Sequence, residues 1–264
     1  MAIKLIALDL DGTLLTSDKK ITTRTKDIIA RAMARGVTVT IATGRMLRSA
    51  LYFTRLLASD APVVCCNGGY VGRAEGAPVF ARYFDPALTR EFLTFAYEHS
   101  WYVNWYRGLD IYAPEYRAEY FTAYRTTAGF VVHEVGDDYL RYTENVPQFV
   151  LRELDAGIDA YVRTVREHFG DQLLPQQNTG TSVDINPPGV NKAVGVKALA
   201  DAMGLGLDEV MVAGDADNDY EMLEMGAFSV VPENGLPEAK ERASYVTASN
   251  DANGIALAIE KFVL

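Results

Sequence analysis

The sequence lacks the features that mark secreted and membrane proteins. Its two cysteines, Cys65 and Cys66, are neighbours in an apolar stretch, so they do not indicate a disulfide framework and are expected as buried small hydrophobes. No apolar run approaches the roughly 18 residues of a membrane span. The start, Met1-Ala2-Ile3-Lys4, leads directly into an expected strand without a secretory signal. We therefore expect a cytoplasmic protein with no membrane partner.

Basic residues are fewer than acidic ones. The chain has 25 Lys and Arg against 35 Asp and Glu, a net charge of −10. This balance argues against a nucleic-acid partner. It does not exclude a small anionic substrate, because a bound cation can reverse the local field. With 264 residues, 49% of them hydrophobic, the chain can form one large or two small globular domains.

Expected strands and helices alternate through residues 1–82 and again through residues 188–264. The first strand, Ile3–Leu8, is an unbroken apolar run, as in strands that are covered on both faces. This alternation predicts an α/β fold with a Rossmann-like parallel sheet. We expect further strands at Val37–Ala42, Pro62–Cys66, Val210–Ala213, Phe228–Val231 and Tyr245–Thr247, and helices at Thr22–Arg35, Met46–Ala58, Lys192–Met203, 218–225, Pro237–Arg242 and Gly254–Phe262.

Residues 83–187 differ in composition, because aromatic residues are frequent there and both tryptophans lie among them. We expect this segment to be an α+β domain inserted into the parallel-sheet core, and we interpret its aromatic residues as core packing. Its expected helices are Pro86–His99, Pro114–Thr127 and Ala156–Phe169. The expected linkers on either side are Ala81–Asp85 and Asn186–Gly189.

The run Asp9-Leu10-Asp11-Gly12-Thr13-Leu14 stands where the first strand ends. Side chains at i and i+2 of an extended segment point the same way, so Asp9 and Asp11 are expected to converge at the carboxyl end of the strand, where parallel sheets bind ligands. Two carboxylates this close suit Mg²⁺, which uses such ligands together with a substrate phosphate. An Asp can also be a nucleophile that forms an aspartyl-phosphate. The alternative is an Asp-rich turn that merely ends the strand.

A second acidic run, Gly214-Asp215-Ala216-Asp217-Asn218-Asp219, follows the expected strand Val210–Ala213. Its acids suit a cation, and its amides, at the start of a helix, suit phosphate. An EF-hand calcium loop is not indicated, because a strand precedes the acids and the central glycine is missing. A solvated, Asp-rich helix start is the alternative.

Two shorter motifs complete the set. Thr43-Gly44-Arg45 ends the second strand and offers a hydroxyl and backbone amides to a phosphate oxygen, although a threonine N-cap would look the same. Lys192 begins a helix, where a lysine is unfavourable, and this placement hints at contact with phosphate, although a merely solvated lysine is the alternative and the more common case. A parallel sheet gathers all four motifs on one edge, so together they predict a single site.

These motifs, in this order, resemble the haloacid-dehalogenase-like superfamily, and more specifically the Cof-type sugar-phosphate phosphatases with a type IIB cap. The resemblance covers essentially the whole chain, and the place of the 83–187 insert fits such a cap. It implies a Mg²⁺-dependent phosphatase for a small phosphorylated metabolite. A sugar phosphate is the first expectation, and flavin mononucleotide (FMN) and pyridoxal phosphate are further candidates.

The resemblance also implies a role for each site residue. Asp9 would attack phosphorus, and Asp11 would protonate the leaving alcohol and later activate water. Mg²⁺ would be held by the Asp9 carboxylate, the Asp11 carbonyl and Asp215. Phosphate oxygens would be held by Thr43, Lys192, Asn218 and the amides of Leu10 and Gly44, with Asp219 supporting the metal or Lys192, and Arg45 as a further site candidate. Because a general acid must keep its proton, we expect a raised pKa for Asp11.

Several points stay open at this stage. A phosphomutase on the same scaffold would keep every motif, whereas a non-catalytic binding protein is disfavoured because Asp9 and Asp215 are both present. Pro232-Glu233-Asn234-Gly235 replaces the Gly-Asn-Ala turn that such chains often have. We expect a monomer, because an inserted cap already covers the site. The three histidines, which match no motif and are expected as ordinary surface or helix-end residues, are His99, His133 and His168.

Overall fold

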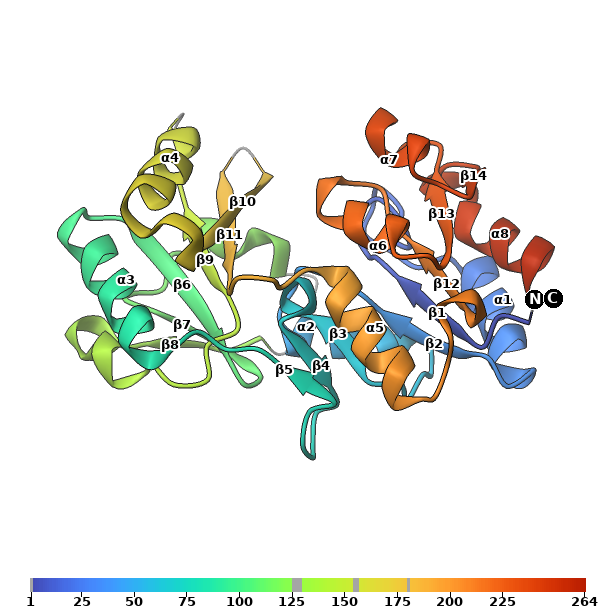
Figure 1. Cartoon of the computed structure of the whole chain (residues 1–264), viewed down its shortest axis with the longest axis horizontal. Helices are drawn as coiled ribbons and strands as arrows, with labels where there is room; N and C mark the ends of the chain where they lie inside the picture. Colours follow the sequence, from blue (N-terminus) through green and yellow to red (C-terminus); the bar gives the residue numbers. More distant parts are fainter. Residues whose placement is uncertain (1, 125–129, 154–156, 180) are drawn as a thin grey trace. The chain divides into compact units, whose positions relative to one another are not determined.

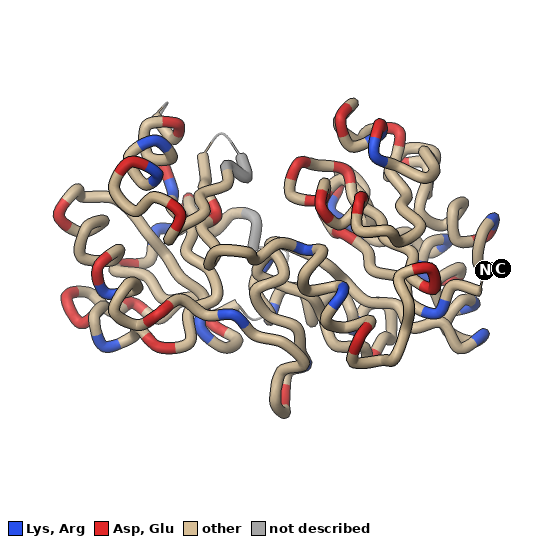
Figure 2. The backbone as a smooth tube through the Cα atoms, viewed as in Figure 1, with Lys and Arg blue, Asp and Glu red and all other residues tan. Residues whose placement is uncertain are grey.

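A computed structural model describes residues 2–124, 130–153, 157–179 and 181–264 of the chain. The chain forms two compact units. The core unit comprises Met1–Arg45, Ala50–Phe80 and Asn191–Leu264, and the insert unit comprises Met46–Ser49 and Ala81–Val190. Among the described residues, no helix combines the length and hydropathy that crossing a bilayer requires. Figure 2 shows acidic and basic positions intermingled along both units.

A five-stranded parallel sheet forms the centre of the core unit, with strand order β14-β13-β12-β1-β2. All residues of β1 and β12 are buried, as expected for strands covered on both faces. The short sheet β3-β4-β5 extends from β2 through a bridge between Ala42 and Val64. The strands of the core unit are β1 (Leu5–Leu8), β2 (Thr38–Ile41), β3 (Val63–Cys65), β4 (Tyr70–Gly72), β5 (Phe80–Ala81), β12 (Val210–Ala213), β13 (Phe228–Pro232) and β14 (Tyr245–Thr247).

Helices cover both faces of the parallel sheet (Figure 1). On one face, α5 (Lys192–Ala202) and α6 (Tyr220–Glu224) pack against the alternate residues Leu5, Ala7, Val210 and Val212. On the other, α1 (Thr23–Ala34) packs beside α8 (Gly254–Phe262). The other α-helices that begin or lie in this part of the chain are α2 (Leu47–Leu56) and α7 (Pro237–Glu241).

The insert unit is built on a six-stranded mixed sheet, with strand order β10-β11-β9-β6-β7-β8. Two helices, α3 (Pro86–Glu98) and α4 (Ile158–Phe169), accompany this sheet. The predicted fold class, a Rossmann-like parallel-sheet core with an additional α+β part, is therefore confirmed. The strands of the insert unit are β6 (Tyr102–Arg107), β7 (Asp110–Ala113), β8 (Val132–Glu134), β9 (Phe149–Arg152), β10 (Leu174–Thr179) and β11 (Ser182–Asn186).

The two faces of the insert sheet differ in chemistry. One face carries aromatic and aliphatic residues of the hydrophobic core, among them Trp105, Phe149 and Ile185, which are paired across β6, β9 and β11. The opposite face carries the alternate residues of the same strands, and we call it the polar face. Two rows of cross-strand neighbours form it, Tyr102, Arg152 and Ser182 in one and Asn104, Val150 and Asp184 in the next, and Tyr106, Gln148 and Asn186 continue it.

One helix prediction was wrong. Pro114–Thr127 is not an α-helix, because Ala118–Tyr124 forms a 3₁₀ segment in which Phe121 leaves helical geometry at φ −113°. The ring of Tyr120 packs on that of Tyr102 at 4.4 Å between centroids, and Phe121 is fully buried. Tertiary packing of these rings therefore overrides the helical spacing of the sequence. Residues 125–127 of the predicted helix, and Ala156 of another, lie outside the described residues.

Candidate active site

The carboxyl ends of three neighbouring strands carry the predicted site residues. Asp9 follows β1 directly, and its N–H donates to the carbonyl of Ala213, the last residue of β12, at 2.9 Å. On the other side of β1, the N–H of Ala42 donates to the Leu8 carbonyl at 2.8 Å, which places Thr43 beside the same edge. Because β1 lies between β12 and β2, the loops that carry Asp9, Thr43 and Asp215 meet at one edge of the sheet.

Lys192 joins two of the acidic residues from the start of α5. Its Nζ donates to Asp9 Oδ1 and to Asp219 Oδ1, each at 2.7 Å. The side chains of Lys192 and Asp219 are fully buried, and Asp9 is 6% exposed. Burial acts to lower the pKa of Lys192, but the carboxylates of Asp219 and Asp9 outweigh it and raise that pKa, so the amine is held as an ammonium.

Asp9, Asp215 and Asp219 offer oxygens that all lie within 4.8 Å of one another. Both carboxylate oxygens of Asp219 are already in hydrogen bonds. Its Oδ2 accepts from the N–H groups of Asp215 at 2.9 Å and Ala216 at 3.1 Å, and its Oδ1 accepts from Lys192. Asp215 Oδ1 accepts from the Thr13 hydroxyl at 2.5 Å. Within the described part of the chain, Oδ2 of Asp9 and Oδ2 of Asp215 have no hydrogen-bond donor. These two oxygens are therefore the ones available to a cation.

Charge in this cluster is unbalanced, with three carboxylates against one ammonium. Burial raises the pKa of Asp9 well above its usual value, even with Lys192 beside it. Burial, assisted by the charge of Asp219, also raises the pKa of Asp215 to about 6, against the hydrogen bond from Thr13. Carboxylate oxygens of this kind fit a hard divalent cation, which would favour their ionised forms. The donor set thus fits Mg²⁺.

The expectation of a raised pKa for Asp11 was wrong for this structure. Arg45 donates to Asp11 through Nε at 2.7 Å and Nη2 at 2.8 Å, and Lys19 Nζ adds a third bond at 2.8 Å. Burial acts to raise the pKa of Asp11, but the bonds from Arg45 and then Lys19 outweigh it and lower the pKa to about 2. Asp11 is therefore an ionised carboxylate here.

The predicted phosphate-binding groups lie at the same edge of the sheet as the acidic cluster. Thr43 is 2% exposed, and its hydroxyl accepts from the N–H of Arg45 at 3.2 Å. The N–H groups of Leu10 and Gly44 have no acceptor among the residues that the structure describes. Amides and a hydroxyl in such a turn are suited to an anion.

Asn67 is a site residue that our sequence analysis missed. It follows β3 in a left-handed backbone conformation, φ 52°, and its Oδ1 accepts from Asn218 Nδ2 at 3.3 Å. A Cβ added to Gly44 would lie 2.7 Å from the same Asn67 oxygen, so this amide fills the space beside the Thr43-Gly44 turn. The sequence held a signal for Asn67, because this residue comes just after the expected strand Pro62–Cys66, whose end lies at the same sheet edge.

The turn that carries Asp11 and Gly12 is held by a loop that departs from the family pattern. This loop is Pro232-Glu233-Asn234-Gly235. Asn234 Nδ2 donates to the Gly12 carbonyl at 2.8 Å, and Asn234 Oδ1 accepts from the N–H of Asn250 at 2.9 Å. The N–H of Leu236 donates to the Asp215 carbonyl at 2.9 Å. This loop therefore holds the turns that carry both Asp11 and Asp215.

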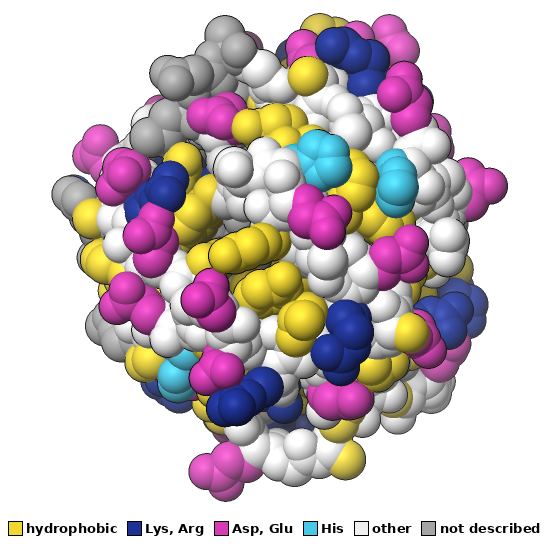
Figure 3. All heavy atoms as spheres, turned by 90° about the vertical axis from the view of Figure 1, so that its left-hand side faces the viewer, with side chains coloured by type: hydrophobic (Ala, Val, Ile, Leu, Met, Phe, Trp, Pro, Cys, Tyr) yellow, Lys and Arg dark blue, Asp and Glu magenta, His cyan; other side chains and the backbone are white. Residues whose placement is uncertain are grey.

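The three histidines all belong to the insert unit. His99 and His168 pack against the ring of Phe95 at centroid distances of 4.0 and 4.4 Å. Figure 3 shows histidines beside hydrophobic side chains on the face that it displays. His133 Nε2 lies 2.9 Å from Asp110 Oδ2. None of these contacts joins the acidic cluster.

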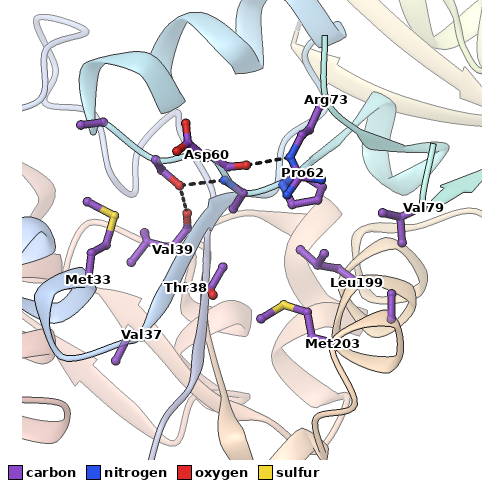
Figure 4. Close-up of a pocket in the computed structure, with 14 residues that line it drawn as sticks. Met33, Val37, Thr38, Val39, Asp60, Pro62, Arg73, Val79, Leu199 and Met203 are labelled. Carbon is purple, nitrogen blue, oxygen red and sulfur yellow. Dashed lines mark hydrogen bonds between the residues drawn. The ribbon is translucent and has the colours of Figure 1, made fainter. Parts of the chain in front are cut away.

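The core unit also has a cavity of about 530 Å³ that contains none of the predicted site residues (Figure 4). It is lined at the amino-terminal start of β2, by Thr38 among others, whereas Thr43 follows the other end of that strand. Its wall includes Met33, Leu199 and Met203, and Arg73 Nε donates to the Asp60 carbonyl at 2.9 Å. This cavity is therefore separate from the acidic cluster.

Comparison with known proteins agrees with this geometry. Residues 6–259 match the model of the haloacid dehalogenase-like hydrolases. The chain is 34% identical over its whole length to the whole of a Streptococcus pyogenes serotype M6 protein named as a phosphatase. It is 30% identical, over 98% of its length and 97% of the relative's, to the 5-amino-6-(5-phospho-D-ribitylamino)uracil phosphatase YitU of Bacillus subtilis.

At the level of fold, the chain resembles the crystal structure of a haloacid dehalogenase-like hydrolase from Bacteroides thetaiotaomicron. The TM-score is 0.90 at 23% identity, with 98% of this chain and 99% of that one covered. The resemblance to Cof-type phosphatases is confirmed, and so is the expected enzyme class, a phosphatase. The chain belongs to the haloacid dehalogenase-like hydrolase family.

Proposed function

We propose that this enzyme is a Mg²⁺-dependent phosphomonoesterase that acts on a small phosphorylated metabolite through an aspartyl-phosphate on Asp9. The observation that carries the proposal is the gathering of Asp9, Lys192 and Asp215 at one edge of the sheet. Phosphoryl transfer needs in-line positioning and neutralisation of charge, and a buried ammonium beside a carboxylate nucleophile serves both needs.

In the first step, a carboxylate oxygen of Asp9 attacks phosphorus, and the bond from phosphorus to the alcohol oxygen breaks. Asp11 gives the departing alcohol its proton. In the second step, Asp11 takes a proton from water, whose oxygen attacks phosphorus and releases phosphate and the Asp9 carboxylate. Because Asp11 is ionised when it is bonded to Arg45 and Lys19, we propose that it leaves both partners and takes up a proton before it acts as the acid.

Mg²⁺ would be held by Asp9, Asp215 and the Asp11 carbonyl, and when bound it would offset the negative charge of the phosphate oxygens. Lys192, Thr43, Asn218 and the amides of Leu10 and Gly44 would hold those oxygens. Asp219, with both carboxylate oxygens in hydrogen bonds, would keep Lys192 and the Asp215 turn in place. Arg45 would hold Asp11 between turnovers.

For the remaining parts of the enzyme, we propose that residues 83–187 act as a cap that selects the leaving group and excludes water. A sugar phosphate is the substrate class implied by the family resemblance, and FMN and pyridoxal phosphate remain candidates. The relative YitU is named for a phosphorylated ribitylaminouracil, which adds a fourth class. The net charge of −10 disfavours a nucleic-acid partner. A monomer in the cytoplasm is a further part of the proposal.

The test is phosphate release from a panel of sugar phosphates, FMN and pyridoxal phosphate, with Mg²⁺ and with a chelator. Release that requires Mg²⁺ and is lost in Asp9→Asn is expected. Formation of an isomer without release of phosphate would instead identify a phosphomutase, and activity retained in Asp9→Asn would overturn the proposed nucleophile.

A further inference from the structure

We propose that the cavity at the start of β2 binds a small carboxylate with an apolar body, such as a short branched-chain carboxylic acid. All of its lining residues belong to the core unit, and none of them belongs to the proposed catalytic machinery. Its volume of about 530 Å³ lies within the usual range of small-molecule sites in proteins. Binding there is independent of the proposed phosphatase function.

The cavity lies where β2 and β3 separate. Ala42, which directly follows β2, forms an isolated parallel bridge with Val64 of β3. Two residues before Val64, Pro62 has no N–H to donate, so the hydrogen-bond ladder between the strands ends there. The carbonyl of Val39 instead accepts from Ser59 Oγ at 2.5 Å. The amino-terminal part of β2 thus has an open edge on this side.

The open edge leaves the N–H of Val39 without an acceptor among the described residues. The preceding N–H, that of Thr38, faces β1 and donates to the Lys4 carbonyl at 2.8 Å. The N–H of Val39 therefore faces the other side, together with its own carbonyl and with Ser59, which lines the cavity. Val39 is 1% exposed, and buried backbone donors nearly always have a partner. We therefore expect a ligand to supply an acceptor.

Arg73 supplies a positive charge beside this donor. In a continued ladder the carbonyl of Asp60 would accept from the N–H of Val39, but it accepts from Arg73 Nε at 2.9 Å instead. This bond brings the guanidinium to the open end of the ladder. Among the described residues, Arg73 forms no ion pair with a carboxylate, and Figure 4 shows the carboxylate of Asp60 pointing away from it. A ligand carboxylate would accept from both donors and carry the matching charge.

An apolar wall defines the rest of the ligand. Leu199, Met203, Met33 and Val79 line the cavity from three other segments of the core unit (Figure 4). Methionine side chains adapt their shape to apolar groups of different form. Because the Asp60 carboxylate points away, the cavity presents no carboxylate to an α-ammonium group. An acid without an amino group therefore fits better than an amino acid.

The ligand test titrates the nitrogen-15-labelled protein with 4-methylpentanoate and follows its amide signals by two-dimensional NMR. We expect a saturable shift of the Val39 signal. The Kd should be about tenfold lower than for 4-methylpentanamide, which keeps the shape but lacks the charge, because hydrogen bonds to charged groups are the stronger ones. Acetate, which lacks the apolar body, should bind at least about tenfold more weakly than 4-methylpentanoate.

Three results would overturn the inference. The first is no saturable shift of Val39, or shifts confined to Thr43 and Gly44, which would place the acid elsewhere. The second is an equal Kd for the acid and the amide, which would remove the role of charge. The third is tighter binding of leucine than of 4-methylpentanoate, since leucine differs from this acid by its added ammonium group.

The variant test replaces Arg73 by Gln, which removes the charge at an exposed position. We expect the Kd of 4-methylpentanoate to rise about tenfold while the Kd of 4-methylpentanamide stays the same. Arg55→Gln is the matched control, because Arg55 is an exposed arginine of the core unit that does not line the cavity, and it should change neither Kd. An unchanged Kd of the acid in Arg73→Gln would show that Arg73 does not bind the carboxylate and would overturn the inference.

Discussion

Arg45 holds Asp11 through two parallel hydrogen bonds, from Nε to Oδ2 at 2.7 Å and from Nη2 to Oδ1 at 2.8 Å. The guanidinium fork matches a carboxylate in this way better than any other side chain does. These two bonds keep Asp11, the proposed general acid, in its ionised form. Release from Arg45 then becomes a step that precedes proton transfer to the leaving alcohol.

Replacing Arg45 by Gln should raise the pKa of Asp11 from about 2 towards its ordinary value, because the largest favourable contact of the carboxylate is lost. Carbon-13 NMR titration of the aspartate carboxyl groups in the metal-free protein measures this directly. Lys19→Gln, which removes one bond from a half-exposed lysine, should raise the same pKa less. If the pKa of Asp11 is the same in Arg45→Gln as in the parent protein, Arg45 is not what keeps this carboxylate ionised.

Lys192→Met should destabilise the protein by about 3 kcal/mol or more at pH 7, because it leaves the carboxylates of Asp9 and Asp219 buried without a counter-ion. Urea unfolding of the metal-free protein gives the value. The double variant Lys192→Met, Asp219→Asn should recover part of this loss but none of the activity. If the single variant is as stable as the parent, the ion pairs are not what holds this cluster.

The stabilisation by Mg²⁺ should depend on pH because the pKa of Asp215 is about 6 in the metal-free protein. A raised pKa means that the folded state binds the proton more tightly than the unfolded state does. The contribution of Asp215 to stability is therefore full below the unfolded pKa near 4 and is lost as pH rises through about 6. Mg²⁺ needs the ionised carboxylate and competes with that proton.

The difference in melting temperature between Mg²⁺ and chelator should therefore be small at pH 5 and increase as pH rises through about 6. Thermal unfolding across this range measures it. Asp215→Asn serves as the control, since it should abolish the difference at every pH. A difference in the parent protein that is constant from pH 5 to 7.5 would contradict the assignment of Asp215 as a ligand.

Gly44→Ala should lower both kcat/KM and the melting temperature, because the added Cβ would lie 2.7 Å from Asn67 Oδ1 and displace the Thr43-Gly44 turn. Adding Asn67→Gly removes the obstructing amide, and glycine accepts the left-handed backbone at that position. We expect the double variant to recover the stability lost in Gly44→Ala, as measured by thermal unfolding. If the double variant is no more stable than Gly44→Ala, contact with Asn67 is not the cause of the lost stability.

Sequence reasoning predicted the parts of the site that depend on strand order. Asp9, Thr43 and Asp215 each follow an apolar strand, and parallel pairing of β2, β1 and β12 is sufficient to bring them to one edge. The pairing of Lys192 with Asp219, which we considered as one of two roles for Asp219, also follows from where α5 begins.

The predictions that failed depend on long side chains and on tertiary packing. The pKa of Asp11 is lowered because Arg45 and Lys19, which lie 34 and 8 residues away in the chain, both reach it. No local pattern in the sequence shows that these two side chains contact Asp11. The helix expected over Pro114–Thr127 has suitable spacing, but Tyr120 and Phe121 are instead placed by the rings and strands around them.

The central claim is that Asp9 is the nucleophile of a Mg²⁺-dependent phosphatase. The most direct measurement is phosphate release from p-nitrophenyl phosphate by the parent protein and by Asp9→Asn, each with Mg²⁺ and with a chelator. We predict release only by the parent protein and only with Mg²⁺. Comparable release by a folded Asp9→Asn variant, or by the parent protein in the chelator, would contradict the account.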